Sequence, residues 1–237
     1  MVHRPKISLP HLFQFSTDNS TLPGWGPYIA SFLTAGTPVF NKAIGGRSAR
    51  SYTNEGRFAE ITPLLKANDI VVIEFGHNDG GSPNSATDNG RSDCPGTGNE
   101  VCTSGKTGEK VYTFNKYVSD AAKAYVAKGA KVIVASQTPN NQWEGGVYND
   151  AAPRFVGYAK TVGEGSGSGV TYVDHFAAVS KAYKKLGNAG TNKFFPKDHT
   201  HTSPDGAKFV ANAFAQAVKE GNTPLKGFVR GDIKLVY

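Results

Sequence analysis

The sequence predicts an α/β fold of three layers, with a five-stranded parallel sheet between helices and a flavodoxin-like winding. Short apolar runs alternate along the chain with longer segments of helical period, which is typical of parallel strands joined by crossover helices. The best runs, 69–75 and 131–136, are almost wholly apolar, as strands buried on both faces should be. We expect residues 1–237 to form a single domain, because no change in composition divides them.

The elements follow in order along the chain. The strand candidates are residues 12–15, 37–43, 69–75, 131–136 and 169–174, and the helix candidates are residues 25–33, 114–129, 153–162, 175–187 and a last helix that starts at Ser203. Gly129 is a typical helix stop. Ser203 and Pro204 form a helix start, since a Ser cap followed by Pro suits the first turn. Ligands of such sheets bind outside the carboxyl ends of the strands.

Composition and charge limit the classes of binding partner that we expect. No apolar run approaches the roughly 18 residues that a membrane span requires, so no membrane partner is expected. The formal net charge is +7, which favours an acidic partner, either nucleic acid or an anionic polysaccharide. Lys and Arg are scattered, with no zinc-ligand spacing or recognition helix, so nucleic acid is not expected. An ordinary solvated surface would also account for the charge.

The chain has two cysteines, Cys94 and Cys102, in a polar, glycine-rich stretch. A disulfide that closes an exposed loop is the interpretation we favour, and two free thiols are the alternative. A disulfide predicts an oxidising compartment and therefore a secreted protein. The first residues do not resemble a signal peptide, because their short apolar stretch is interrupted by Pro10 and His11.

Polar residues at the predicted strand ends suggest chemistry. GHNDGG, residues 76–81, follows the best strand, and AIGGRSARS, residues 43–51, follows an earlier one. The DHTH segment places Asp198 three residues before His201, just ahead of the last helix. Acyl transfer by a serine enzyme needs a nucleophile, an imidazole base, a carboxylate that orients the base, and donors for the oxyanion. Asp198 and His201 are candidates for the second and third of these roles.

Four motifs together resemble one family. GGRSARSYTNEGRF, VIEFGHNDGG, SQTPNNQWEGG and FPKDHTHTSPDGA, in this order, are similar to SGNH (GDSL-type) hydrolases and above all to fungal rhamnogalacturonan acetylesterases. The likeness extends from about Gly24 to about Val218. It implies a flavodoxin-like fold, no metal, and the removal of acetyl groups from galacturonic acid residues in the rhamnogalacturonan of pectin. We expect no cofactor and a monomer. Cys94 and Cys102 fall where that family has a disulfide.

The resemblance also implies roles for single residues. Gly46 matches a glycine whose backbone N–H is an oxyanion donor, and Asn78 an asparagine whose side-chain amide is another. His201 matches the general base and Asp198 its orienting partner. Two further residues, Arg47 and Trp143, are candidates for contacts with the sugar. For Arg47, a surface ion pair is the alternative.

The nucleophile does not follow from the motif, because the sequence contains no Gly-Asp-Ser. The best alignment places Ser16 at the nucleophile, where its N–H would be the first oxyanion donor. Ser20 is the rival. The departures from the family make residues 1–18 atypical. Asn19 begins a glycosylation sequon, which we expect to be unused if the enzyme is active.

Two alternatives to a pectin acetylesterase stay open. One is an acetylesterase for another plant polysaccharide such as xylan. The other is a catalytically impaired, carbohydrate-binding relative, which the missing Gly-Asp-Ser motif favours.

Overall fold

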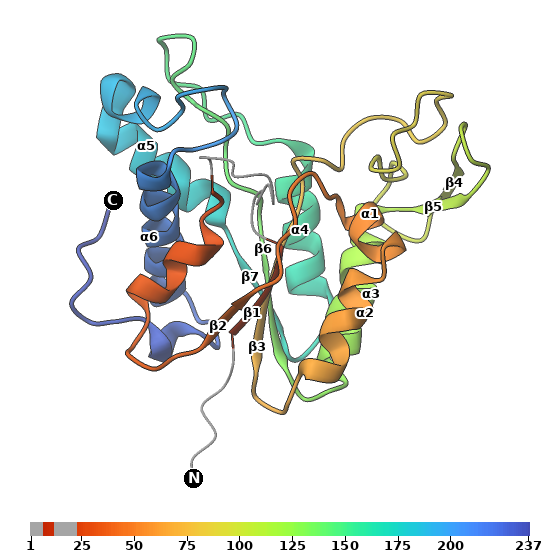
Figure 1. The fold of residues 1–237 in the computed structure, drawn as a ribbon, viewed down its shortest axis with the longest axis horizontal. Helices are drawn as coiled ribbons and strands as arrows, with labels where there is room; N and C mark the ends of the chain where they lie inside the picture. Colours follow the sequence, from red (N-terminus) through yellow and green to blue (C-terminus); the bar gives the residue numbers. More distant parts are fainter. Residues whose placement is uncertain (1–6, 12–22) are drawn as a thin grey trace.

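A computed structural model describes the backbone of residues 7–11 and the whole of residues 23–237. Its main sheet is parallel, with the strand order β2-β1-β3-β6-β7 (Figure 1). These strands are β1 (Ile7–His11), β2 (Val39–Asn41), β3 (Ile70–Glu74), β6 (Lys131–Ala135) and β7 (Val170–Val173). This order is the flavodoxin-like one, in which the winding changes direction between β1 and β3. The predicted α/β fold around a parallel sheet is confirmed.

Helices cover both faces of the sheet (Figure 1). On one face lie α1 (Ala49–Asn54), α2 (Arg57–Ile61), α3 (Phe114–Val126) and α4 (Arg154–Gly165); on the other lie the 3₁₀ helix η1 (Gly26–Phe32), α5 (His175–Asn192) and α6 (Pro204–Glu220). Two short 3₁₀ turns, η2 (Thr62–Leu64) and η3 (Lys226–Phe228), complete the helical segments of the described chain. No helix in residues 23–237 has the length and apolar character to cross a membrane.

The two central strands divide their side chains between two cores. Successive strand residues point to opposite faces. Thus Ile70 and Val72 of β3 pack with η1, α5 and α6, whereas Val71 and Ile73 pack with α1 to α4. Strand β6 alternates in the same way. All four named side chains are at most 2% exposed, which is why the apolar run was a reliable strand signal.

Helix α6 begins as the sequence predicts. The Ser203 hydroxyl accepts a hydrogen bond from the backbone N–H of Gly206 at 3.3 Å, and Pro204 occupies the first turn. Helix α3 ends at Val126, and Gly129 follows in the turn after it with a φ of +81°, which suits a residue without a side chain. The start of α6 matters for function, because it sets where the preceding DHTH segment lies.

Some elements differ from the prediction. The first strand is Ile7–His11, ahead of the predicted residues 12–15, and those four residues lie outside the described chain. Helices α1 and α2 were not predicted, because six and five residues are too few to build up a helical period. The two-stranded ribbon of β4 (Val101–Thr103) and β5 (Lys110–Tyr112) was also missed.

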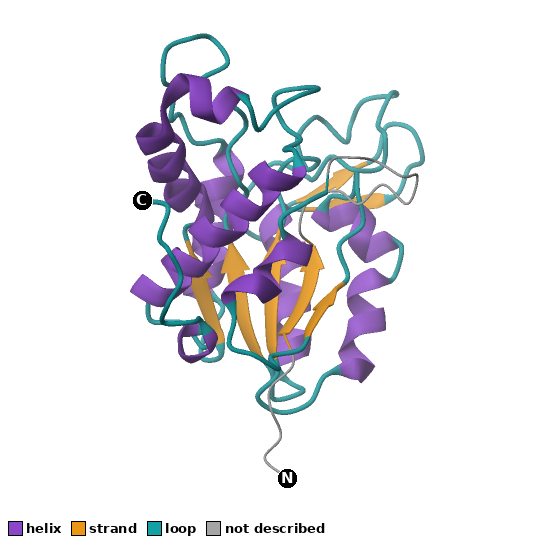
Figure 2. Cartoon of the chain, turned by 60° about the vertical axis from the view of Figure 1, so that its left-hand side comes forward, coloured by secondary structure: helices purple, strands orange, loops and turns teal. Residues whose placement is uncertain are grey.

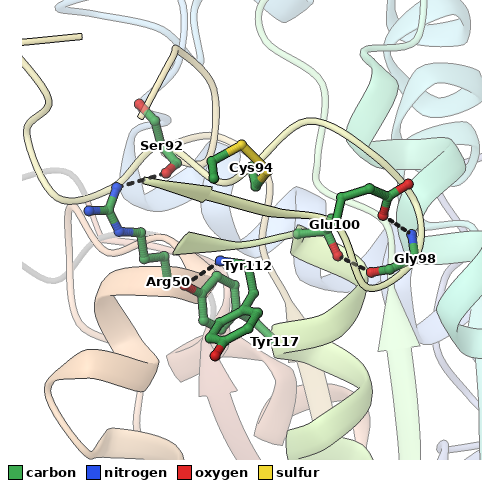
Figure 3. The surroundings of a disulfide bond; sticks show 9 residues. Arg50, Ser92, Cys94, Gly98, Glu100, Tyr112 and Tyr117 are labelled. Atoms are coloured by element: carbon green, nitrogen blue, oxygen red, sulfur yellow. Dashed lines mark hydrogen bonds between the residues drawn. A yellow bond between two sulfur atoms is a disulfide. The ribbon is translucent and has the colours of Figure 1, made fainter. Parts of the chain in front are cut away.

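The predicted disulfide between Cys94 and Cys102 is confirmed (Figure 3). It lies in the long excursion between β3 and α3 that contains the ribbon. Arg50 of α1 holds this excursion to the domain: its guanidinium donates to the Ser92 carbonyl at 2.9 Å and pairs with the Asp88 carboxylate at 2.8 Å (Figure 3 shows the Ser92 contact). Arg50 is fully buried, so this charge depends on its partners.

Candidate active site

The loops that carry the predicted site residues gather at the carboxyl end of the sheet (Figure 2). The strand arrows in that view point toward this group of loops. They comprise the segments after β2, β3 and β6, and the segment that leads into α6. The placement agrees with the rule that α/β sheets bind ligands at this edge, near the change in winding.

Asp198 and His201 form a hydrogen-bonded dyad. His201 Nδ1 lies 2.7 Å from Asp198 Oδ2, and the other carboxylate oxygen, Oδ1, accepts the backbone N–H groups of Thr200 and His201, each at 2.7 Å. Burial opposes ionisation of Asp198, but these hydrogen bonds outweigh it and hold its pKa below the usual range. The ionised carboxylate can only accept, so Nδ1 donates, and Nε2 is left to act as a base.

The His201 side chain is 26% exposed and lines a small pocket. Other residues of that pocket are Trp25, Thr138, Pro139 and Thr200. A hydrogen bond fixes the position of Trp25: its indole N–H donates to the Glu74 carboxylate at 3.0 Å. The imidazole therefore stands beside an apolar wall and is still open to solvent, as a base that must meet a substrate should be.

Gly46 and Asn78 lie close together, although 32 positions separate them in sequence. The Asn78 amide nitrogen donates to the Arg47 carbonyl at 3.3 Å, and Arg91 Nη1 donates both to Asn78 Oδ1 at 3.1 Å and to the Gly46 carbonyl at 3.4 Å. A guanidinium has no acceptor, so it fixes which end of the Asn78 amide faces it. Gly46 has a φ of +72°, which favours glycine.

Hydrogen bonds join the loops to one another. His77, next to Asn78, donates from Nε2 to the Thr138 carbonyl at 2.8 Å. Asn141, in the loop after β6, donates its N–H to the His199 carbonyl at 2.7 Å. The Asn78 loop is thus tied to the β6 loop, and the β6 loop to the segment that carries the dyad.

A buried pair of carboxyl groups lies beneath the two glycine-containing loops. Asp79 accepts the backbone N–H of Ala49 at 2.7 Å and that of Gly76 at 2.9 Å, so it holds the loops after β2 and β3 together. Burial raises the pKa of Asp79 to about 6. Burial and the neighbouring Asp79 raise the pKa of Asp93 well above its usual value.

Arg47 forms an ion pair with Glu55, 3.0 Å from Nε to Oε1, and also donates to the Gly45 carbonyl at 2.9 Å. This is the surface ion pair that the sequence left as the alternative to a sugar contact. The Trp143 indole N–H donates to the Tyr183 carbonyl at 3.0 Å, and its ring packs on Tyr148. The polar atom of Trp143 is therefore engaged within the protein, which leaves only its ring for a sugar.

The predicted nucleophile Ser16, its rival Ser20 and the sequon at Asn19 all lie outside the described residues. Strand β1 ends at His11, ahead of all three in the sequence.

Three residues of the site were not singled out from the sequence: Arg91, Asp79 and Asp93. Asp79 stands inside GHND and could have been noticed. Arg91 and Asp93 belong to the disulfide excursion, where only a long-range contact gives them meaning. Nowhere in residues 23–237 do three His, Cys, Asp or Glu side chains group as ligands of a metal would.

Comparison with known proteins identifies relatives of this chain. The chain is 51% identical over 205 residues to the rhamnogalacturonan acetylesterase of Emericella nidulans, covering 86% of this chain and 81% of the relative. It is 24% identical over 221 residues to the rhamnogalacturonan acetylesterase RhgT of Bacillus subtilis, covering 86% and 84%.

Solved structures share the fold. The protein YxiM of Bacillus subtilis superposes with a TM-score of 0.69 at 20% identity, over 92% of this chain but 57% of its own. A variant of Axe2, an acetylxylan esterase of Geobacillus stearothermophilus, superposes with a TM-score of 0.55 at 16% identity, over 90% and 93%.

The family model of GDSL-like lipases and acylhydrolases matches residues 13–214, a range that contains the Gly46 and Asn78 loops and the Asp198–His201 dyad. This chain belongs to that GDSL-like lipase/acylhydrolase family.

Proposed function

We propose that this chain is a secreted serine esterase that removes acetyl groups from galacturonic acid residues of rhamnogalacturonan. The observation that carries the proposal is the 51% identity with the Emericella nidulans rhamnogalacturonan acetylesterase over 86% of this chain. The Asp198–His201 dyad supports it, because Asp198 holds Nδ1 and Nε2 is the group that a serine esterase needs as a base. The Cys94–Cys102 disulfide is consistent with secretion.

The reaction has two steps. His201 Nε2 takes the proton of the Ser16 hydroxyl as its oxygen attacks the acetyl carbonyl, and Asp198 stabilises the imidazolium that forms. The imidazolium then protonates the departing sugar oxygen, which leaves an acetyl-enzyme. In the second step, His201 deprotonates water, which attacks the acetyl-enzyme; the imidazolium then returns the proton to the departing Ser16 oxygen, and acetate is released. Over the two steps every proton and oxygen atom is accounted for, and no metal or cofactor is needed.

The oxyanion needs donors at the acetyl carbonyl. We assign the backbone N–H groups of Ser16 and Gly46 and the side-chain amide of Asn78. One such donor typically lowers the barrier by about 3 kcal/mol. One amide proton of Asn78 is used on the Arg47 carbonyl, and the second is available to the oxyanion.

The net charge of +7 suits a polymer of uronates, because it raises the local concentration of an anionic chain. Arg47 and the ring of Trp143 remain candidates for sugar contacts, Arg47 by exchanging Glu55 for a uronate carboxylate.

Acetate release from acetylated rhamnogalacturonan tests the proposal. Wild type, Ser16→Ala, Ser20→Ala and His201→Ala are compared at equal concentration. We expect wild type and Ser20→Ala to release acetate and the other two to be inactive. Activity that survives Ser16→Ala would remove the nucleophile assignment, and activity that survives His201→Ala would remove the dyad from the mechanism. Acetylated xylan in the same assay measures the preference for the polymer.

A second candidate function is carbohydrate binding without turnover, which the missing Gly-Asp-Ser motif favours. It predicts that wild type binds the polymer and releases no acetate from it.

A further inference from the structure

The pocket that His201 lines, here called the His201 pocket, is small and partly apolar. Its volume is about 20 Å³, which is room for a group the size of a water molecule or a methyl group. The apolar part of its lining includes Trp25, Pro139 and Val210. When the carbonyl oxygen of an ester is at the oxyanion donors and its leaving oxygen is at His201, the acyl chain still needs an apolar surface. This pocket offers one beside His201, and its volume suits the methyl group of an acetyl ester.

Two buried titratable side chains connect two residues of the pocket wall. The Trp25 indole N–H donates to Glu74 Oε1 at 3.0 Å, and Glu74 Oε2 lies 2.8 Å from His175 Nδ1. His175 Nε2 lies 3.2 Å from the Val210 carbonyl oxygen. Glu74 and His175 are at most 1% exposed, so neither can touch a substrate. The hydrogen bonds therefore run from one wall residue, Trp25, through a buried acid and a buried imidazole to another wall residue, Val210.

The partners determine where the protons of this chain of hydrogen bonds lie. A backbone carbonyl can only accept, so His175 Nε2 carries a proton and donates it to Val210. The 2.8 Å contact between His175 Nδ1 and Glu74 Oε2 requires one further proton between these two atoms, so the pair as a whole has no net charge. The other oxygen of Glu74 then accepts from the indole of Trp25. The position of the indole nitrogen is thereby fixed by a directed hydrogen bond.

Ring contacts surround the same indole. The centroid of the Trp25 ring lies 4.9 Å from that of His175 and 4.5 Å from that of Phe214, and His175 and Phe214 are 5.0 Å apart. Apolar side chains of similar volume could fill this core without the cost of burying an acid and an imidazole. They could not supply an acceptor for the indole N–H. The contribution specific to the buried pair is therefore the orientation of Trp25.

We propose that Glu74 and His175 are positioning residues that hold the Trp25 ring as a wall of the His201 pocket, and that this wall selects the acetyl group over longer acyl chains. The inference rests on the proposed function, since it takes an acetyl ester as the substrate. Neither residue touches the substrate, and both act through Trp25 and Val210.

The length of the acyl chain provides the test. The kcat/KM for 4-nitrophenyl butyrate is divided by the kcat/KM for 4-nitrophenyl acetate. Butyrate has two more CH₂ groups than the pocket has room for, so wild type should give a ratio of about 0.1 or less. Glu74→Leu leaves the indole N–H without its acceptor and should raise the ratio about fivefold or more. Equal kcat/KM values for the two esters in wild type, or an unchanged ratio in Glu74→Leu, would overturn the proposal.

Two further variants distinguish positioning from a general loss of packing. In Glu74→Gln the side-chain oxygen can accept from Trp25 and the nitrogen can donate to His175 Nδ1, so all the hydrogen bonds are kept. Val218→Ala opens the same core about two turns beyond Val210 on α6 and leaves Glu74 unchanged. Both variants should give ratios within about twofold of wild type. A rise in either of them equal to that in Glu74→Leu would overturn the proposal.

Trp25→Phe changes the wall itself. It keeps an aromatic ring in the core but is smaller and lacks the N–H, so the ratio should again rise about fivefold or more. If Glu74→Leu does not fold, a ratio in Trp25→Phe equal to that of wild type would overturn the proposal.

Hydrogen exchange of the indole N–H separates this inference from the proposed function. The chain has two tryptophans, so a ¹⁵N–¹H spectrum contains two indole signals, which Trp143→Phe assigns. In Glu74→Leu the Trp25 indole proton should exchange with solvent about tenfold faster or more, with no change at Trp143. Equal exchange of the Trp25 proton in wild type and Glu74→Leu would overturn the positioning role.

The two proposals can fail separately. A wild type that prefers 4-nitrophenyl acetate and shows this exchange result, but releases no acetate from rhamnogalacturonan, would contradict the proposed function and still support the positioning role. A wild type that hydrolyses neither 4-nitrophenyl ester would overturn both.

Discussion

The two halves of the candidate site are assembled in different ways. Asp198 and His201 are three residues apart, and backbone N–H groups of the same turn complete their arrangement. Gly46, Asn78 and Arg91 come from three segments, joined by hydrogen bonds across 13 to 45 positions. A local turn can form its geometry from its own residues. The group of Gly46, Asn78 and Arg91, here called the oxyanion group, forms only once the sheet and the disulfide excursion are in place. The dyad should therefore tolerate changes elsewhere, and the oxyanion group should be sensitive to them.

The largest effect is expected at the dyad. His201→Ala removes the base, and acetate release should fall by roughly 10³-fold or more. His199→Ala is the matched control, because that imidazole is about half exposed and lies near Glu144 rather than Asp198. It should leave activity within about twofold. Equal losses in both variants would indicate that the whole segment, and not the dyad, had been disturbed.

The next largest effect is expected at Asn78, the side-chain donor of the oxyanion group. Asn78→Ala should lower kcat by about 10²–10³-fold with little change in KM, since an oxyanion donor acts mainly in the transition state. Steady-state kinetics with 4-nitrophenyl acetate measure both constants. A change confined to KM would instead make Asn78 a residue that binds the ground state.

The carboxyl pair beneath the two loops predicts a pH dependence of stability. The folded-state pKa values of Asp79 and Asp93 are raised, so the pair's contribution is complete at acid pH. It is lost as the pH rises through about 6 for Asp79 and through the raised pKa of Asp93. Asp93→Asn has nearly the same size and shape as Asp93 but cannot ionise.

Urea unfolding at pH 5, 7 and 9 measures this contribution. Asp93→Asn should lose less free energy of unfolding between pH 5 and 9 than wild type. Asp120→Asn, at an exposed acid that pairs with Lys116, should follow wild type. Parallel curves for wild type and Asp93→Asn would show that the pair does not govern the alkaline loss.

The smallest effect is expected at Arg91, which we regard as a positioning residue. Arg91→Met removes the donor that fixes the Asn78 amide and the Gly46 carbonyl, and kcat should fall about tenfold with KM nearly constant. Arg91→Lys keeps a charged donor and should recover part of the loss. If Arg91→Met behaved like wild type, the oxyanion group would be rigid without Arg91. It would then not depend on a distant segment, and it would no longer differ from the dyad in this respect.

Much of the fold could be predicted from local patterns. The apolar runs at β3 and β6 and the capped start of α6 all depend on neighbouring residues, and the structure has each of them. Strand β1 was not predicted, because ISLPH has a proline and a histidine in place of a clear apolar run. Helices α1 and α2 are too short for periodicity to show.

What the sequence alone determined is the alternation of buried strands and amphipathic helices, the disulfide and the Asp198–His201 turn, because each results from contacts between near neighbours. Tertiary structure decided the rest. It brought Arg91 to Asn78 and buried Asp93 against Asp79. Such contacts form only when distant segments are packed against one sheet, and no local pattern encodes that approach.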